Sequence, residues 1–184
     1  LNTTAYSLLR ELTPETGLSY LLDMGFSSIK EEDYNLSSAL GGLTTGVSSL
    51  EITAGYATLA NEGVYRLPDC ITMITDMDGN IVVMPDRKEH AVYDSKAAHE
   101  MTDILEGVLT RGTARGKGIP GMPCAGKTGT TNDYVDVWFA GYSSYYTTGI
   151  WIGFDTPRGG ASLAGSKYPV DIWQDFMTRL HEGL

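Results

Sequence analysis

The sequence predicts an α+β fold, in which helices pack on a mainly antiparallel sheet. Three observations support this class. Apolar residues recur at helical spacing through the first sixty residues, short β-branched and aromatic runs with turn signals follow, and the chain closes on an amphipathic helix. A length of 184 residues fits one domain that is large enough to bury a core.

Two helices are expected at the N-terminal end. Leucines recur at helical spacing within residues 5–12, which predicts the first helix. Thr13 is a preferred N-cap residue and Pro14 suits the first helical position, so a second helix should begin there and end at Gly25. The polar residues 30–35 are then expected to form a surface loop.

A third helix and a hairpin are expected next. Residues 48–51, Ser-Ser-Leu-Glu, match a capping box and predict a helix that ends at residues 61–63, Asn-Glu-Gly. The β-prone runs 70–75 and 81–84 flank an Asp-Gly-Asn turn signal at residues 78–80. This arrangement predicts a β-hairpin.

A long helix and a loop are predicted in the middle of the chain. The helix should be capped by Asp94 or Ser95 and should end near Gly112. Residues 111–123 are rich in Gly and contain Pro, so they are expected to form a loop.

Two strands and a closing helix are predicted for the last third. Residues 134–142 and 147–154 are rich in β-branched and aromatic side chains, with a turn near residues 143–144. After residues 168–169, Tyr-Pro, apolar residues at helical spacing predict one helix stripe that faces the core. The stripe comprises Ile172, Trp173, Phe176, Met177 and Leu180.

Composition excludes several classes of function. The chain has 13 Lys and Arg against 23 Asp and Glu, a net charge of −10. This charge argues against nucleic acid as a partner, because a basic face is needed to displace phosphate counterions. No run of about 18 apolar residues occurs, so no transmembrane helix is expected.

Cysteine and histidine usage predicts neither a disulfide framework nor a metal site. Cys70 and Cys124 lie far apart in the sequence and are expected to be unpaired thiols. His90, His99 and His181 are scattered and lack metal-ligand spacing, and the last two are expected on solvated helix faces.

Residues 107–132 differ from the rest of this acidic chain because they contain no Asp or Glu. Two of the basic residues there, Arg115 and Lys117, are expected on a solvated loop. Lys127 is different, since small Ala, Gly and Thr residues surround it. Small residues let a ligand approach the backbone closely.

The residues next to Lys127 complete a candidate anion site. Thr128 and Thr130 occupy alternate positions, so in a strand their hydroxyls would project to one side. A cation, hydroxyls and exposed N–H groups together suit a carboxylate, or the oxyanion that develops during acyl transfer.

Two other short motifs have competing interpretations. Residues 121–128 fit the P-loop pattern, but no apolar strand precedes them, poor helix formers follow, and Pro123 removes an N–H donor. Residues 27–30, Ser-Ser-Ile-Lys, spell the S-x-x-K motif of serine acyl-transferases. They run directly into the acidic residues 31–33, which look solvated, so Ser27 is interpreted as structural.

Residues 127–129, Lys-Thr-Gly, are the K-T-G element of the same acyl-transferases. Residues 125–142, AGKTGTTNDYVDVWFAGY, resemble the corresponding strands in the transpeptidase domain of class A (bifunctional) penicillin-binding proteins. Residues 40–65, 111–114 and 173–177 are similar to other segments of that domain, in the same order. The likeness covers nearly all of the chain.

The resemblance implies the β-lactamase/DD-peptidase-like fold of serine penicillin-recognising proteins, with S-x-x-K, S-x-N and K-T-G elements in that order. Asn2 resembles the end of S-x-N, whose Ser would precede residue 1. Residues 1–184 are therefore expected to be a partial transpeptidase domain without the nucleophile, inactive by itself and prone to self-associate.

The resemblance also implies roles for individual residues. Lys127 would supply the positive field, the Thr130 backbone N–H would form half of the oxyanion hole, and Asn2 would complete the catalytic set. Hydroxyls of Thr128 and Thr130 would hold the substrate carboxylate. The implied substrate-binding residues are Thr128, Gly129, Thr130 and Thr131.

The implied partners are peptidoglycan stem peptides, as D-Ala-D-Ala donor and amine acceptor, and β-lactam antibiotics; no cofactor or metal is expected. The parent protein would be anchored in the membrane, act at the outer face of the bacterial cytoplasmic membrane and contain a glycosyltransferase domain. Alternatives are a non-catalytic β-lactam sensor or interaction module, a DD-carboxypeptidase or β-lactamase, and a P-loop nucleotide-binding protein. Residues 40–65 disfavour the carboxypeptidase and β-lactamase.

Overall fold

The computed structural model describes residues 2–131, 135–154 and 167–184. The chain forms two compact units, each described here by itself. Unit 1 contains Leu1–Val47 and Val64–Val92, and unit 2 contains Ser48–Gly63 and Tyr93–Leu184.

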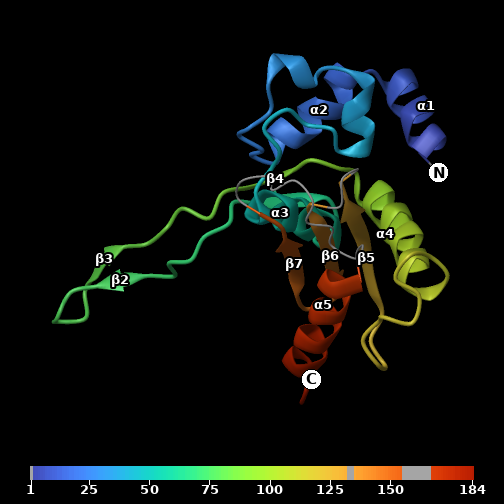
Figure 1. Cartoon of the computed structure of the whole chain (residues 1–184). Coiled ribbons are helices and arrows are strands. Elements are labelled where there is room, and N and C mark those ends of the chain that lie inside the picture. The colour runs from blue at the N-terminus through green and yellow to red at the C-terminus, as the bar shows by residue number, and fades with distance from the viewer. Residues whose placement is uncertain (1, 132–134, 155–166) are drawn as a thin grey trace. The chain divides into compact units, whose positions relative to one another are not determined.

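The helices at the start of unit 1 form where the sequence predicts them (Figure 1). They are α1 (Asn2–Leu12) and α2 (Pro14–Asp23). The Thr13 hydroxyl caps α2 by accepting the N–H of Thr16. Gly25 follows with φ 74°, and a Cβ there would lie 2.9 Å from the Tyr65 hydroxyl. Glycine is therefore required both for its backbone conformation and for its size.

Residues 30–35 differ from the predicted solvated loop. They contain a short 3₁₀ helix, η1 (Glu31–Asp33), followed by η2 (Leu36–Leu40). Asp33 is only 1% exposed, and its carboxylate accepts the N–H of Lys30 at 2.8 Å and the N–H and hydroxyl of Thr44 at 2.7 Å each. These hydrogen bonds, led by the Thr44 N–H, hold the pKa of Asp33 below its usual value.

Replacing Asp33 with Asn is expected to destabilise the chain at neutral pH, because an amide NH₂ would face at least one of the bonded donors. The folded pKa is lowered, so the ionised carboxylate stabilises the fold above the unfolded pKa. That contribution is lost as the pH falls through the folded pKa. Urea midpoints of the two proteins should therefore differ at neutral pH and converge in acid, whereas the exposed Glu32→Gln variant should match the unaltered chain at both. A constant Asp33→Asn deficit at every pH would contradict the assignment.

Residues 64–92 of unit 1 contain two pairs of antiparallel strands. β1 (Val64–Arg66) pairs antiparallel with β4 (Glu89–Ala91), and the sequence analysis did not anticipate either. Between them, β2 (Ile74–Thr75) and β3 (Ile81–Val83) form the predicted hairpin, as Figure 1 shows. Both hairpin strands are shorter than the β-prone runs.

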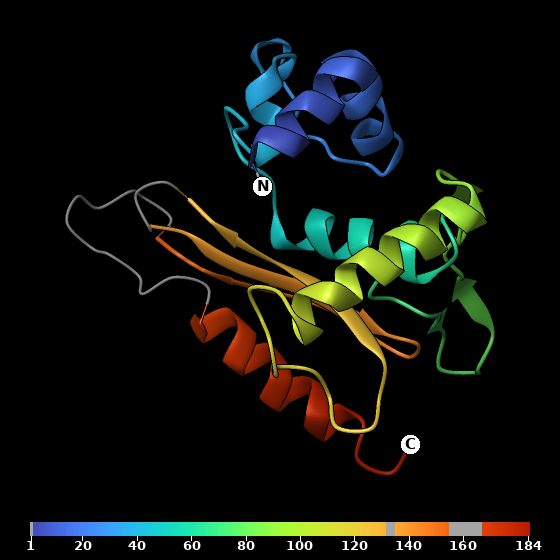
Figure 2. The same ribbon diagram turned by 90° about the vertical axis from the view of Figure 1, so that its right-hand side faces the viewer.

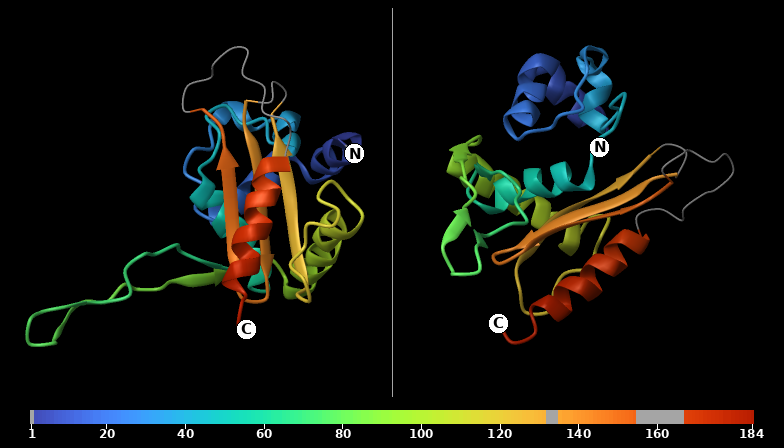
Figure 3. Two further views of the ribbon diagram at one scale, coloured as in Figure 1. Left: turned by 60° about the horizontal axis from the view of Figure 1, so that its bottom comes forward. Right: turned by 90° about the vertical axis from the view of Figure 1, so that its left-hand side faces the viewer.

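Unit 2 is a three-stranded antiparallel sheet covered by helices on both faces (Figures 2 and 3). Figure 2 shows α3 (Ser49–Ala60) and α4 (Ser95–Thr110) on one face of the sheet and α5 (Lys167–Leu180) on the other, and the left view of Figure 3 shows α5 in front of the sheet, running nearly along the strands. The strands of the described sheet in unit 2 are β5 (Cys124–Thr130), β6 (Val137–Ser143) and β7 (Thr147–Ile152). The predicted α+β class is confirmed. Residue 134, at the start of one predicted strand, lies outside the described residues.

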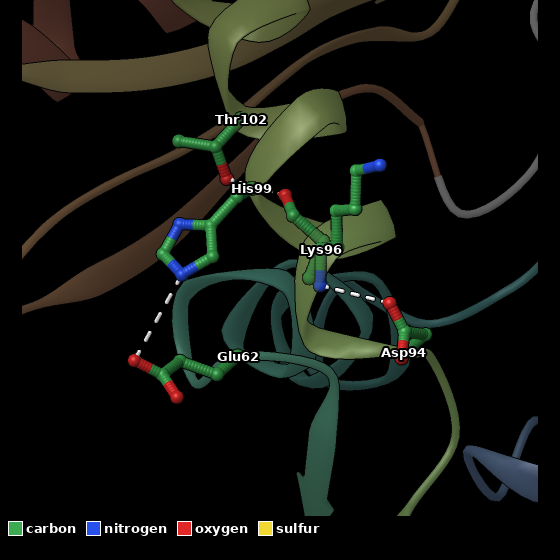
Figure 4. A network of polar contacts seen from close by, with 6 residues as sticks. Glu62, Asp94, Lys96, His99 and Thr102 are labelled. Atoms are coloured by element: carbon green, nitrogen blue, oxygen red, sulfur yellow. Dashed lines mark hydrogen bonds and ion pairs between the residues drawn. The ribbon is translucent and has the colours of Figure 1, made fainter.

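The predicted capping residues begin α3 and α4. Ser48 and Glu51 form the reciprocal capping box of α3. Asp94 caps α4 by accepting the N–H of Lys96 at 3.0 Å (Figure 4). His99 lies exposed on α4, with its Nε2 3.9 Å from the Glu62 carboxylate, in agreement with its predicted solvated position.

One core cluster of unit 2 lies between the sheet and α5, and a second one joins Leu105 of α4 to Ala125 and Tyr142 of the sheet. Trp173, Met177 and Phe139 are fully buried, and their cluster includes Leu109 at the end of α4. The rings of Phe139 and Trp173 meet edge-to-face at 5.0 Å between centroids. This cluster attaches α5 to the middle strand.

The prediction of a single apolar stripe on α5 was wrong. Val170, Trp173 and Met177 face the core, whereas Ile172 and Phe176 are each 48% exposed. Apolar residues occur on both the buried and the exposed sides of α5, so helical spacing alone does not identify the buried side.

The prediction of a solvated His181 was also wrong. Its ring is 9% exposed, with Nε2 2.8 Å from the Ser143 hydroxyl and Nδ1 2.6 Å from the Met177 carbonyl oxygen. Tyr145 and Tyr146 present their rings to it edge-to-face. His181 therefore joins the end of α5 to the β6–β7 turn.

The structure also bears on thiols, membrane-spanning helices and metal-binding groups. Cys70 and Cys124 are both free, as predicted, with Cys70 exposed and Cys124 half-buried. Among the described residues, none of the helices has the length and apolar character needed to span a bilayer. Within the same residues, His, Cys, Asp and Glu side chains form no group that could hold a metal ion.

Candidate active site on the edge strand

The Lys-Thr-Gly sequence lies in the middle of β5, which is one of the two edge strands of the described sheet. Lys127 pairs with Ala140 and Thr128 with Phe139 on β6. The other edge of β5 has no strand beside it among the described residues. Alternate backbone N–H groups of an edge strand point away from the sheet, so this edge offers hydrogen-bond donors to an extended ligand.

The extended backbone excludes the P-loop interpretation. A P-loop needs a helix that begins at its Gly-Lys-Thr sequence, so that N–H groups of the first turn face a phosphate. Here residues 126–128 continue without interruption as strand to Thr130. A nucleotide site of that type is therefore absent from this segment.

Lys127 supplies the positive charge of the site. Its ammonium group donates to the carbonyl oxygen of Thr128 at 2.8 Å. Desolvation by the surrounding protein lowers the pKa of Lys127 from its ordinary value. A partly desolvated cation acts more strongly on a nearby anion than a fully hydrated one does.

The two threonine hydroxyls project to the same side of β5, because their positions alternate in the strand. Thr130 is exposed at the end of the strand, and Thr128 is half-buried. The Thr128 Oγ1 lies 2.8 Å from the Oγ1 of Thr113, which belongs to the loop after α4. Two hydroxyls are thus available on one side of the edge strand.

The glycines around Lys127 are needed for packing within the sheet. A Cβ at Gly126 would lie 2.7 Å from the Phe139 ring, and one at Gly129 would lie 3.1 Å from the Trp138 Cβ. Their small size therefore lets β5 lie close to β6, in addition to leaving the strand open to a ligand.

Thr131, directly after β5, forms hydrogen bonds with Asp136. Its N–H donates to the Asp136 carbonyl oxygen at 3.1 Å, and its hydroxyl accepts the Asp136 N–H at 3.1 Å. These bonds hold the ends of β5 and β6 together. Residue 132 lies outside the described residues.

The remaining candidate residues lie in unit 1. Asn2 is exposed and is the first residue of α1. Ser27 and Lys30 lie between α2 and η1 in a stretch without helix. The S-x-x-K spacing brings Ser and Lys to one face only in a helix, so the interpretation of Ser27 as structural agrees with the structure.

Two features of the loop before β5 were missed from sequence. Lys117, expected to be solvated, forms a half-buried ion pair at 2.7 Å with Asp171 of α5. Thr113 was noted only as part of the similar segment 111–114, and no local pattern indicated that its hydroxyl would meet Thr128. A contact between a loop and a strand depends on the tertiary path of the chain.

The described site therefore combines a lysine cation, two hydroxyls on one side of the strand and an edge that has no neighbouring strand among the described residues. Such an arrangement binds an extended peptide by strand addition and holds a carboxylate beside it. It can also stabilise negative charge that develops on an acyl oxygen.

Comparison with known proteins agrees with this chemistry. The family model described as the penicillin-binding protein transpeptidase domain matches residues 2–177. Penicillin-binding protein 1F of Bacillus subtilis is 36% identical over 98% of this chain, and penicillin-binding protein 4 of the same species is 32% identical over 94%. The chain spans 26% and 28% of the length of these two relatives.

Solved structures of related proteins share the fold. Penicillin-binding protein 1A from Haemophilus influenzae superposes with a TM-score of 0.80 at 20% identity, covering 99% of this chain and 33% of that one. Penicillin-binding protein 3 from Mycobacterium tuberculosis, solved in complex with aztreonam, gives a TM-score of 0.78 at 21% identity, covering 99% and 50%. The predicted resemblance to the penicillin-binding transpeptidase fold is confirmed.

Proposed function

This chain belongs to the penicillin-binding protein transpeptidase family, and we propose that it is the C-terminal part of a peptidoglycan DD-transpeptidase. The observation that supports this most directly is Lys127-Thr128-Gly129, extended along a strand edge that has no neighbouring strand among the described residues. The whole protein would act on stem peptides at the outer face of the bacterial cytoplasmic membrane. β-Lactams would bind the same site.

The proposed reaction is a two-step acyl transfer. A serine Oγ attacks the carbonyl carbon between the two D-Ala residues, and its proton passes to a base. The tetrahedral oxyanion collapses, the C–N bond breaks, and the departing D-Ala amine takes up the proton. The amine of a neighbouring stem peptide then attacks the ester carbon, the bond from that carbon to the serine Oγ breaks, and a proton from the amine passes to the serine oxygen as the new amide forms.

In this mechanism β5 binds the donor peptide. Hydroxyls of Thr128 and Thr130 donate to the terminal carboxylate, while Lys127 stabilises negative charge near it. The Thr130 N–H would donate to the oxyanion, and Gly129 lets β5 lie close to Trp138 of β6. Asn2 is proposed as a catalytic residue only from its resemblance to the end of the S-x-N element.

The nucleophile is proposed to come from polypeptide outside these 184 residues. The S-x-x-K match at Ser27 lies in a non-helical stretch, where Ser and Lys are not held on one face. Without a nucleophile and base, the covalent route is lost whatever the state of the K-T-G strand.

The proposal can be tested with a labelled penicillin. The 184-residue polypeptide should form no covalent adduct, whereas the longer protein that contains it should be acylated stoichiometrically on a serine elsewhere. Intact-mass spectrometry, followed by peptide mapping, measures both. An adduct on Ser27 would contradict the assignment, and a longer protein that is acylated but transfers nothing to an amine would indicate a β-lactam sensor instead.

A further inference from the structure

The hydroxyl of Thr113 forms a contact that the proposed mechanism has not used. Thr113 lies three residues after the end of α4, and its Oγ1 is 2.8 Å from the Oγ1 of Thr128. Both residues belong to unit 2. The contact therefore joins the loop before β5 to the strand that is proposed to bind the substrate carboxylate.

The backbone around Thr113 is fixed by the core. Ala114 is 3% exposed within the Trp173 cluster, and its N–H donates to the Val108 carbonyl oxygen at 3.1 Å. On the other side, a Cβ at Gly112 would lie 2.8 Å from the Val108 Cα. The exposed Thr113 side chain thus extends from a tightly packed turn, and its hydroxyl is held in place.

The direction of this hydrogen bond follows from what each group can donate. A hydroxyl has one proton and accepts through two lone pairs, whereas an ionised carboxylate only accepts. If Thr128 donates its proton to a ligand carboxylate, that proton is not available to Thr113. At 2.8 Å the two oxygens must still share a proton, so Thr113 must donate to Thr128.

We propose that Thr113 is a positioning residue for carboxylate recognition, which donates to the Thr128 hydroxyl and so directs the Thr128 proton toward the ligand carboxylate. This inference rests on the proposed function. Accepting a hydrogen bond from Thr113 also polarises the Thr128 hydroxyl and makes it a better donor. The ligand class is an acyl donor with a free carboxylate, which includes penicillins and D-Ala-D-Ala peptides.

The experiment compares acylation of the longer protein by benzylpenicillin and by its methyl ester. Thr113→Val should lower the second-order acylation rate for the free acid about fivefold to tenfold, since one hydrogen bond is lost, and should leave the ester rate within about twofold. Thr113→Ser should restore the free-acid rate. Thr110→Val is the matched control, because the Thr110 hydroxyl bonds only its own helix at the Glu106 carbonyl oxygen, and its rates should be unchanged.

Two results would overturn the inference while leaving the proposed function intact. One is a free-acid rate unaffected by Thr113→Val, and the other is an equal loss for free acid and ester, which would mean that Thr113 only supports the loop. If Thr113→Val does not fold, Thr113→Ala removes the same hydroxyl and is judged by the same criterion. If the unaltered protein is acylated by neither compound, the proposed function fails, and this inference fails with it.

Discussion

Replacing Lys127 with Ala should lower the rate of penicillin acylation of the longer protein by about 10²–10³-fold, the typical cost of removing a preorganised group that stabilises transition-state charge. Lys127 lies in the strand that is proposed to bind the substrate, and its ammonium group is held by the Thr128 carbonyl oxygen at 2.8 Å. In a variant without Lys127, water molecules would have to reorient before they could stabilise the same transition-state charge, and that reorientation costs free energy. The rate can be followed with a fluorescent penicillin under single-turnover conditions.

Arg115→Ala is the matched control for this prediction. Arg115 is an exposed cation in the loop before β5, so its removal changes the net charge of the protein equally. Its rate should remain within about twofold of the unaltered protein, because Arg115 lies in the loop and not in the strand that is proposed to bind the carboxylate. Equal losses in the two variants would indicate a long-range charge effect and would remove Lys127 from the proposed site.

The local features of this fold were largely predictable from sequence. Thr13 and Ser48 begin their helices as predicted, because an N-cap is specified by residues that are adjacent in the chain. The strand at residues 124–130 was implied by the resemblance of the K-T-G segment, and the poor helix formers that follow Lys127 argued against a helix there. These signals need no knowledge of distant contacts.

The errors concern residues whose environment depends on distant parts of the chain. Asp33 was assigned to solvent because its neighbours are acidic, but Thr44 supplies the hydrogen bonds that bury it. His181 was assigned to solvent for a comparable reason, and Ser143 accounts for its burial. Polar residues are expected at the surface unless partners are known, and sequence does not reveal those partners.

The candidate site also contains both residues that local sequence identifies and a residue that only tertiary contacts identify. Lys127, Thr128 and Thr130 were identifiable because they are close together in a short motif. Thr113 is fifteen positions away from Thr128, in a loop whose path is set by packing of Ala114 in the core. Its contact with the strand could be recognised only from the folded chain.

The largest stability effect in this chain is expected from Trp173→Ala, which should lower the free energy of unfolding by about 3–5 kcal/mol. Trp173 is fully buried, packs edge-to-face on Phe139, and donates from its indole to the Gly141 carbonyl oxygen at 3.3 Å. The substitution leaves a cavity between α5 and the middle strand. Urea denaturation followed by circular dichroism measures the loss.

Phe176→Ala is the control for Trp173→Ala. Both variants replace an aromatic residue of α5 with Ala, but only Trp173 is buried in the core. Phe176 is 48% exposed, so its loss should cost about 1 kcal/mol or less. Similar losses in the two variants would mean that α5 does not pack on the sheet through its Trp173 side.

Trp173→Ala should also affect the substrate strand. Because Phe139, which packs on Trp173, pairs with Thr128, Trp173→Ala should speed hydrogen exchange in β5, whereas Phe176→Ala should not. The core beneath the sheet would then be seen to stabilise the strand that is proposed to bind substrate.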